Sequence, residues 1–286
     1  MQLTLPAIAI NGELNKQVSP LDRGFAYGDG VFESCRIIQA KIPLWKLHAQ
    51  RLIASCETLL IPISISVVND YLAQLMRLIS EHDLEDAIVK IIVTRGTGGR
   101  GYRLPDQINP TICIGIFPAI LYPESYSSAG VSVRICSLRL GCNPVLAGLK
   151  HLNRLEHILA RAEWNDEEFA EGLLFDTNNN LIEATVSNVF IVQNGELFTP
   201  EVIDAGVAGV MRRLVIEELA VQIGLEVCVK KLSREDLWSA NEIFLCNSVF
   251  GIWPVINVFD QRNYFFARGS KTLLLQRLLA ARLLAS

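Results

Sequence analysis

Stretches rich in β-branched residues alternate along this chain with helical patterns, and this alternation restricts the fold to a mixture of strands and helices. Two strongly β-branched runs, 87–96 and 110–117, follow a helical pattern at 67–80. Another helical pattern covers 44–60, and a meander of short strands with Asn-Gly and Asn-rich turns covers 171–200. The sequence therefore predicts an α/β protein.

A segment without periodicity separates two such regions. Residues 118–130 are rich in Pro, Ser and Tyr, a composition typical of an interdomain linker. The 286 residues suffice for one large domain or two ordinary ones. We therefore predict a small N-terminal α/β lobe over residues 1–118, a linker over 119–130 and a larger C-terminal lobe over 131–286.

The second region also has recognisable helices. A strand-like run at 131–138 precedes a predicted helix at 152–164, and another helix begins near Gly209 and ends at Gly224. The Ser-x-x-Asp sequence at 233–236 is typical of a helix start. The C-terminal residues form a last helical pattern, which we expect to pack on the core.

Composition excludes several classes of function. The formal net charge is −4 and no basic stripe is present, so no nucleic-acid partner is expected. Seven scattered cysteines without a Cys-x-x-Cys pair indicate reduced thiols, and four histidines without His-x-x-x-His spacing predict no metal site. Neither a signal peptide nor an apolar run of roughly 18 residues is present, so we expect a cytoplasmic protein that does not enter a membrane.

One lysine lies at a junction between a strand and a helix. Lys150, in the sequence LAGLKHLNRLE, follows the strand-like run 131–140 and precedes an apolar helical pattern. A lysine amine that is desolvated at such a junction becomes a nucleophile or a base. A solvated surface lysine is the ordinary alternative. Only the other candidate residues, those of an anion site and Glu183, favour a reactive lysine.

Several residues suggest an anion site. Gly206 and Gly209 immediately precede a helix, whose first amides and positive dipole end attract phosphate. Arg51 could bind the phosphate as a charged fork, and Ser248 could donate from its hydroxyl. A plain glycine loop, a solvated arginine and a turn serine are the alternatives.

Glu183 follows an Asn-rich turn and has apolar neighbours. A carboxylate buried there without a partner would cost free energy. A protonated pyridine nitrogen would be such a partner, whereas a solvent-facing glutamate at a strand edge is the alternative. An amine, an acid for a ring nitrogen and an anion cradle are together what pyridoxal phosphate chemistry requires.

The chain resembles the fold-type IV pyridoxal phosphate enzymes nearly from end to end. This group contains branched-chain and D-amino acid aminotransferases and aminodeoxychorismate lyases. The resemblance rests on five ordered motifs: DRGFAYGDGVFE at 22–33, HAQRL at 48–52, LKHLNRLE at 149–156, EATVSNVF at 183–190 and GVAGVMR at 206–212. It implies a two-lobed fold, with a small α/β lobe and a larger lobe that has a β-barrel-like core and carries the cofactor lysine.

The resemblance implies a role for each matching residue. Lys150 would be the covalent anchor of pyridoxal 5'-phosphate and the catalytic base, and Glu183 would meet the pyridine nitrogen. Asn188 would brace the cofactor pocket. The phosphate would be bound by Arg51, by the backbone amides of Val210 and Met211, and by Asn247 or Ser248. Glu33 stands where related lyases place small hydroxylated side chains, and its role is open.

Two segments, 94–103 and 139–156, are most similar to the aminodeoxychorismate lyases within this group. The resemblance then implies a homodimer that releases pyruvate from 4-amino-4-deoxychorismate and forms 4-aminobenzoate for folate synthesis. Arg100, Tyr102, Arg103 and Arg154 are candidates to bind the two substrate carboxylates. An aminotransferase acting on D-amino acids or branched-chain amino acids is the nearer alternative, and a non-catalytic binding protein is the more distant one.

Overall fold

The computed structural model describes residues 5–81, 85–165 and 167–285. Its contacts divide the chain into two compact units. The first unit contains the residues up to Ile120 together with Leu149–Asn153, and the second contains Leu121–Gly148 and Arg154–Ala285. The segment that carries Lys150 thus groups with the first unit, whereas we had counted it in the larger lobe. The predicted lobe boundaries themselves stay a prediction.

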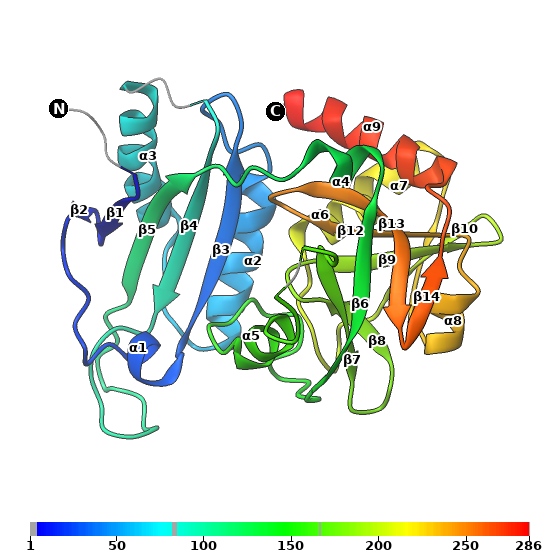
Figure 1. The fold of residues 1–286 in the computed structure, drawn as a ribbon. Helices are drawn as coiled ribbons and strands as arrows, with labels where there is room; N and C mark the ends of the chain where they lie inside the picture. Colours follow the sequence, from blue (N-terminus) through cyan, green and yellow to red (C-terminus); the bar gives the residue numbers. More distant parts are fainter. Residues whose placement is uncertain (1–4, 82–84, 166, 286) are drawn as a thin grey trace. The chain divides into compact units, whose positions relative to one another are not determined.

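The first unit is built on a five-stranded antiparallel sheet with the strand order β2-β1-β5-β4-β3 (Figure 1). Its strands are β1 (Ala7–Ile10), β2 (Glu13–Leu14), β3 (Gly30–Ile37), β4 (Ala87–Thr94) and β5 (Thr111–Pro118). Its helices are α1 (Arg23–Tyr27), α2 (Trp45–Thr58) and α3 (Ile65–Glu81). The helices predicted at 44–60 and 67–80 correspond to α2 and α3, whereas α1 was not predicted.

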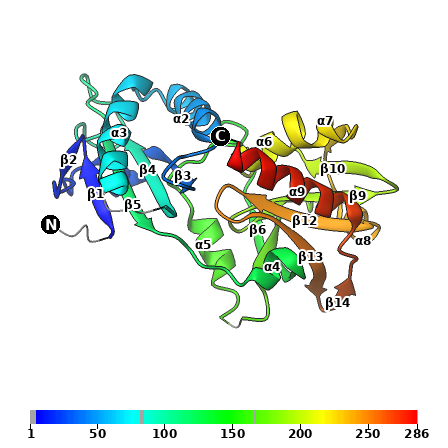
Figure 2. The same ribbon diagram turned by 90° about the horizontal axis from the view of Figure 1, so that it is seen from above.

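Alternating side chains of the first sheet form a core with two helices. Apolar residues of β3, β4 and β5 pack against Leu52 and Cys56 of α2 and against Leu75 of α3. Both helices lie on the same side of the sheet (Figure 2). The side chains of β3 alternate between this buried face and a partly exposed one, with Phe32 and Ser34 on the latter. Neighbouring side chains of β3 therefore lie in different surroundings, one in the core and the next on the partly exposed face.

The second unit contains a nine-stranded, curled half-barrel sheet in the order β11-β10-β9-β12-β13-β6-β7-β8, with β14 paired to β13. Its strands are β6 (Val131–Leu140), β7 (Glu171–Asp176), β8 (Leu181–Ala184), β9 (Asn188–Gln193), β10 (Glu196–Pro200), β11 (Val227–Lys230), β12 (Glu242–Asn247), β13 (Gly251–Asp260) and β14 (Arg262–Phe265). The sheet contains both parallel and antiparallel strand pairs, and its strands enclose one apolar core.

Helices surround this second sheet. They are α4 (Glu124–Ser128), α5 (Leu155–Arg161), α6 (Val210–Leu214), the π-helical turn η1 (Val215–Leu219), α7 (Ala220–Gln222), α8 (Arg234–Trp238) and α9 (Ser270–Leu284). The helix predicted from Gly209 to Gly224 is the continuous run α6–η1–α7, and the capping box predicted at Ser233 and Asp236 opens α8. The predicted linker contains α4. The helix predicted at 152–164 is observed as the shorter α5. It does not begin at residue 152, because Leu149–Asn153 belong to the first unit.

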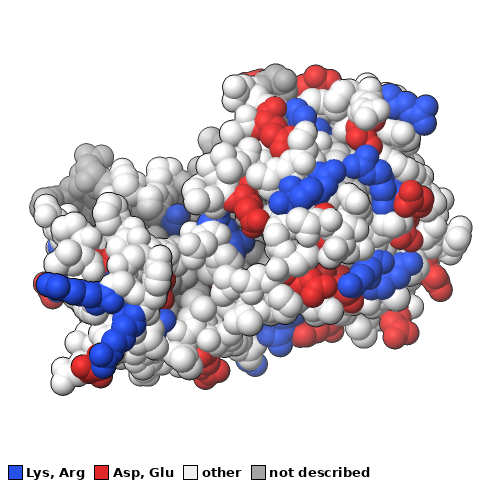
Figure 3. All heavy atoms as spheres, turned by 90° about the horizontal axis from the view of Figure 1, so that it is seen from below, with Lys and Arg blue, Asp and Glu red and all other residues white. Residues whose placement is uncertain are grey.

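Two features of the described chain concern membranes and surface charge. No described helix combines the length and the apolar character that crossing a membrane requires. On the face drawn in Figure 3, basic and acidic side chains are interspersed and form no stripe of one sign.

A fully buried carboxylate shapes the loop between β8 and β9. Glu171, at the start of β7, accepts hydrogen bonds from the backbone amides of Thr185 and Val186 at 3.0 and 2.9 Å. It also accepts from the hydroxyls of Thr185 and Ser187 and from the amide of Gly172. Because β8 ends with Glu183 and Ala184 and β9 begins with Asn188, Glu171 fixes the connection between two predicted site residues.

Replacing this carboxylate tests its role in the fold. Glu171→Gln puts an amide NH₂ group, which cannot accept, against donors that now bind a carboxylate oxygen. We expect the free energy of unfolding to fall by about 2–4 kcal/mol, since each buried donor left without a partner costs about 1–3 kcal/mol. Urea unfolding measures this. Glu156→Gln is the control, because Glu156 is exposed and its oxygen accepts only from the Gly141 amide among the bonds described; equal losses in both variants would contradict the assignment.

Candidate active site

The Lys150 segment is attached to the edge of β3 by its main chain. The Phe32 amide donates to the Lys150 carbonyl at 2.9 Å, and the Leu152 amide donates to the Gly30 carbonyl at 3.0 Å. Val31 and His151 form an isolated antiparallel bridge between these two bonds. Residues 150–152 therefore extend the first sheet by a short strand, which explains why no helix begins at Leu152.

The Lys150 amine lies over an aromatic ring. Its Nζ is 4.4 Å from the centroid of the Phe32 ring, and Lys90 Nζ is 5.4 Å from the same centroid. Phe32 thus contacts two amino groups on the partly exposed face of β3. An amine that rests on an apolar ring is partly desolvated, which is the environment that reactive lysines require.

Glu33 lies on the opposite, helix-facing side of β3 and binds two residues of α2. Arg51 donates from Nε to Oε1 at 2.8 Å and from Nη2 to Oε2 at 2.5 Å. His48 Nδ1 donates to Oε2 at 2.7 Å. Glu33 and His48 are each 1% exposed. This geometry answers the question that the sequence left open, because Glu33 points away from the face that carries the Lys150 amine.

Burial and charge compete at this cluster. Burial alone would raise the pKa of Glu33, but the positive charge and hydrogen bonds of Arg51, with the hydrogen bond from His48, hold that pKa at about 2. Burial lowers the pKa of His48, although the bond to Glu33 opposes this. Glu33 is therefore ionised at neutral pH, and His48 acts as a donor to it. The cluster fixes the guanidinium of Arg51 on the first unit.

Glu183 is the buried carboxylate of the second unit that the sequence singled out. It is 3% exposed, and its Oε2 accepts from the Val207 amide at 2.9 Å and from Asn188 Nδ2 at 3.5 Å. Its Oε1 is 2.9 Å from His157 Nε2. Arg154 interacts with it electrostatically: burial lowers the pKa of Arg154, and the charge of Glu183 acts in the opposite direction. Residues from three segments thus act on this carboxylate: Arg154 and His157 at α5, Asn188 at the start of β9, and Val207 before α6.

The start of α6 has the form that an anion site requires. Gly209 is the N-cap and offers no side chain to the first amides of the helix, which include those of Val210 and Met211. A Cβ on Gly209 would lie 1.9 Å from Asn188 Oδ1, so only glycine fits. Asn188 Nδ2 also donates to the Val207 carbonyl at 2.9 Å. Asn188 therefore braces both Glu183 and this helix start.

The turn after β12 distinguishes Asn247 from Ser248. Asn247 Oδ1 accepts from the amides of Val249 and Phe250 at 2.9 and 2.8 Å, and its Nδ2 donates to the Val186 carbonyl at 3.2 Å. The side chain of Asn247 is thus committed to closing the turn. No hydrogen bond from the Ser248 hydroxyl to another residue of the described chain is found.

The loop with the candidate substrate residues is exposed but anchored. Tyr102 is 88% exposed, and the side chain of Arg103 pairs with Asp106 at 3.4 Å in solvent. Arg23 holds the backbone of this loop, because its Nη1 donates to the carbonyls of Gly101 and Arg103 at 3.0 and 3.4 Å. Arg100 is also exposed. The loop therefore has a fixed backbone and solvated side chains.

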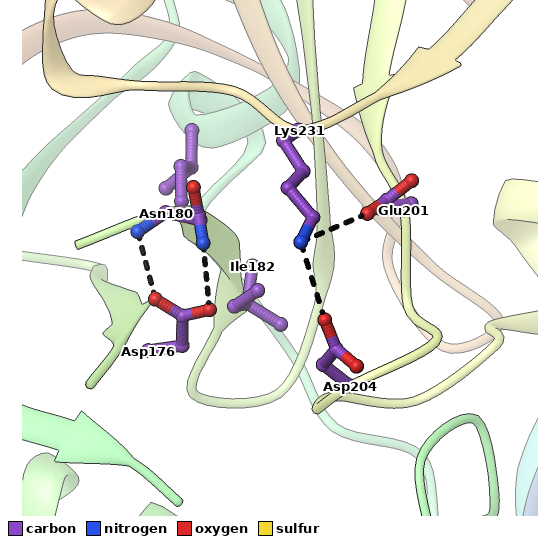
Figure 4. A pocket seen from close by; sticks show the side chains of 7 residues that line it. Asp176, Asn180, Ile182, Glu201, Asp204 and Lys231 are labelled. Atoms are coloured by element: carbon purple, nitrogen blue, oxygen red, sulfur yellow. Dashed lines mark hydrogen bonds and ion pairs between the residues drawn. The ribbon is translucent and has the colours of Figure 1, made fainter. Parts of the chain in front are cut away.

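In a separate pocket of the second unit, each acidic side chain has a polar or charged partner. Lys231 lies between Glu201 and Asp204, at 3.7 and 3.4 Å, and Asp176 accepts hydrogen bonds from Asn180 (Figure 4). These pairings account for the acidic groups that line it. Within the described ranges, no three His, Cys, Asp or Glu side chains are arranged to hold a metal ion.

Comparisons with known proteins identify the family of this chain. The sequence profile of the family "amino-transferase class IV" matches residues 30–258. The chain belongs to the class IV aminotransferase family. An aminodeoxychorismate lyase of Vibrio harveyi is 36% identical over 256 residues, which are 89% of this chain and 92% of that protein. A putative branched-chain-amino-acid aminotransferase of Methanocaldococcus jannaschii is 34% identical over 259 residues, 88% of this chain and 87% of the relative.

A solved structure shows the fold type. The crystal structure of 4-amino-4-deoxychorismate lyase from Pseudomonas aeruginosa has a TM-score of 0.89 and 39% identity, and the match covers 96% of this chain and 98% of that one. The fold is therefore that of the fold-type IV enzymes, as predicted. Enzymes of this family use pyridoxal 5'-phosphate, so the predicted cofactor is confirmed.

The residues of this chain fit such a cofactor. Lys150 has its amine on an apolar ring, Glu183 is a buried acceptor, and Gly209 leaves the first amides of α6 without a side-chain cap. His157 Nδ1 and His151 Nδ1 are buried atoms, and the former has no hydrogen-bond partner among the described residues. An amine, an acid and an open helix start are the donor set that the cofactor's aldehyde, ring nitrogen and phosphate require.

Sequence reasoning missed two partners of the site residues. His48 precedes Arg51 by three positions on one helix, so the two share a face, and that spacing was a usable signal. His157 is 26 positions from Glu183, and no pattern in the sequence links them. Long-range pairing of polar residues has no periodicity to reveal it.

The Glu33 cluster predicts a pH dependence. A carboxyl whose pKa is lower when folded stabilises the protein above its unfolded pKa, near 4.5, and this contribution is lost as pH falls toward about 2. Glu33→Gln lacks it, so we expect this variant to be less stable at neutral pH by about 3 kcal/mol. The deficit should shrink below pH 4.5 in urea titrations. Glu57→Gln, on the exposed side of α2, should follow the unaltered protein at every pH; a constant deficit for Glu33→Gln would contradict the prediction.

Proposed function

We propose that this protein is a 4-amino-4-deoxychorismate lyase, which releases pyruvate and forms 4-aminobenzoate for folate synthesis. The observation that carries the proposal is the pairing of an intact Lys150 and Glu183 with a lyase-like sequence around them. The segments 94–103 and 139–156 resemble the lyases, and relatives named as lyases are 36% and 39% identical.

We assign the cofactor contacts residue by residue. Lys150 is the covalent anchor, Glu183 accepts from the ring nitrogen, and Asn188 braces Glu183. The phosphate is bound by Arg51, by the amides of Val210 and Met211, and by Ser248. Asn247 is the less suitable donor, because its side chain closes the turn before Ser248. Arg51 reaches the phosphate from a fixed position, because Glu33 holds its Nε and Nη2.

When bound, pyridoxal phosphate supplies an aldehyde and an electron-withdrawing ring. The Lys150 amine would take the proton from the substrate ring carbon that bears the nitrogen. It then returns a proton to the enolpyruvyl carbon as the C–O bond breaks, so that pyruvate leaves with a methyl group. The remaining ring is aromatic, which drives the elimination. Glu183 would favour the protonated form of the cofactor's ring nitrogen, and the reaction would need no amino acceptor.

The dianionic substrate calls for cationic partners. Arg100, Arg103 and Arg154 are our candidates, with Tyr102 as a hydroxyl donor. Arg23 supports the first two and Tyr102, because it binds the backbone of their loop. Arg154 lies beside Glu183, where its charge also balances that carboxylate.

We also propose a cytoplasmic homodimer. All seven cysteines are free thiols, which suits a reducing compartment. The short helix α5 exposes Leu155, Ile158 and Leu159 at 72%, 60% and 60% in the single chain. A second copy would remove these apolar side chains from water.

An aminotransferase is the second candidate, and the 34% identity to the putative branched-chain enzyme favours it. One assay separates the two. Aminodeoxychorismate is supplied without an acceptor, and 4-aminobenzoate and pyruvate are measured together. Equal amounts of both support the lyase. Glutamate formed from 2-oxoglutarate and an amino acid, with no pyruvate from aminodeoxychorismate, would support the aminotransferase.

Lys150→Ala tests the anchor. We expect turnover to fall by at least about 10³-fold, because the variant loses both the covalent attachment and the base. After borohydride reduction, intact mass should show the cofactor retained on the unaltered protein and absent from the variant. Lys46→Ala, at an exposed position of α2, is the control and should keep both properties. Covalent cofactor on the Lys150→Ala protein would refute the assignment.

Arg100→Ala and Arg103→Ala test the substrate contacts. Loss of a charge-assisted hydrogen bond to a carboxylate costs about 1.5–3 kcal/mol, so KM for aminodeoxychorismate should rise roughly 10- to 100-fold. Arg277→Ala, an exposed change on α9, should leave KM unaltered. If Arg103→Ala left both KM and kcat unchanged, Arg103 would have no part in binding the substrate.

A further inference from the structure

His157 contacts Glu183, the carboxylate that we propose binds the ring nitrogen of the cofactor. It lies on α5, and its Nε2 is 2.9 Å from Glu183 Oε1. The side chains of His157 and Glu183 are 13% and 4% exposed, so little water competes for this bond. An ionised carboxylate can only accept, which makes the imidazole Nε2–H the donor.

The two oxygens of Glu183 are held differently. Oε2 accepts from the Val207 amide and from Asn188, whereas Oε1 has His157 as its partner. A carboxylate oxygen can accept two hydrogen bonds, so Oε1 can take a second donor beside His157. The contact from His157 also fixes the rotation of the carboxylate, because Oε2 is already tied to a backbone amide.

The other nitrogen of the imidazole indicates that this contact has a purpose beyond packing. His157 Nδ1 is buried and has no hydrogen-bond partner among the described residues. A buried polar atom without a partner costs about 1–3 kcal/mol. An apolar side chain on α5 would avoid that cost, and the bond from Nε2 to Glu183 is what the histidine provides in exchange.

We propose that His157 is a positioning residue, which holds Glu183 so that Oε1 receives the protonated ring nitrogen of pyridoxal phosphate. The inference rests on the proposed role of Glu183 and adds a residue to it. His157 does not touch the reacting atoms. By holding Glu183, it increases the preference of the site for a cofactor with nitrogen, rather than carbon, at that ring position.

The experiment compares two cofactors on the apoprotein. Dissociation constants are measured for pyridoxal phosphate and for its 1-deaza analogue, in which C–H replaces the ring nitrogen. The unaltered protein should prefer the natural cofactor. In His157→Leu this preference should fall about tenfold, the loss expected for one hydrogen bond to a charged group. His157→Gln should restore most of it, because its amide can donate from a position near that of Nε2. Glu156→Gln, the neighbouring change on α5, should keep the full preference.

The outcomes separate the inference from the function on which it rests. If the unaltered protein binds both cofactors equally, the role of Glu183 fails. If it prefers the natural cofactor and His157→Leu retains that preference in full, the inference about His157 is overturned while Glu183 stands. Thermal unfolding of the apoproteins checks the fold. Should His157→Leu not fold, His157→Asn, whose amide is too short to reach Glu183, takes its place against His157→Gln.

Discussion

Buried carboxylates need donors, and this requirement fixes the parts of the structure on which the proposed chemistry depends. Glu33, Glu171 and Glu183 are each at most 3% exposed, and each is surrounded by N–H or O–H groups. Removing a carboxylate from water is costly unless its oxygens are satisfied, so each one determines the position of the groups that satisfy it. Glu33 positions Arg51, Glu171 positions the loop before Asn188, and Glu183 is left with one oxygen suited to a further donor.

Main-chain hydrogen bonds hold the Lys150 segment in position, whereas buried carboxylates hold Arg51 and the loop before Asn188. A lysine side chain has many rotamers, and a reactive amine needs its backbone held. Hydrogen bonds with Gly30 and Phe32 make residues 150–152 an added strand on β3. On the same connection, the Gly148 amide donates to the Gly206 carbonyl and its carbonyl accepts from Ala208. Both the lysine and the glycines before α6 therefore have fixed backbones, although no side chain is responsible.

Sequence periodicity predicted the helices and strands whose apolar faces are long, such as α2, α3 and α9. It did not predict α1, a five-residue helix that is capped at its start by the side chain of Asp22 and at its end by the backbone amide of Gly28. It also extended α5 too far toward its N-terminus, because the bonds between residues 150–152 and β3 are non-local. Lys150, Glu183 and Asn188 were predicted as site residues from motifs, whereas His48 and His157, the partners of Glu33 and Glu183, depend on contacts 15 and 26 positions apart.

The alternation of side chains along β3 explains how Glu33 can stand where related lyases place small hydroxylated side chains. In a β-strand, neighbouring side chains point to opposite faces, so Phe32 and Ser34 share the face of the Lys150 amine while Glu33 lies among the helices. An acid at position 33 adds no negative charge to the face where the amine lies. It instead supplies the counter-charge that keeps the partly buried Arg51 in place. Glu33 therefore fixes the position of Arg51, to which we assign a part in binding the cofactor phosphate.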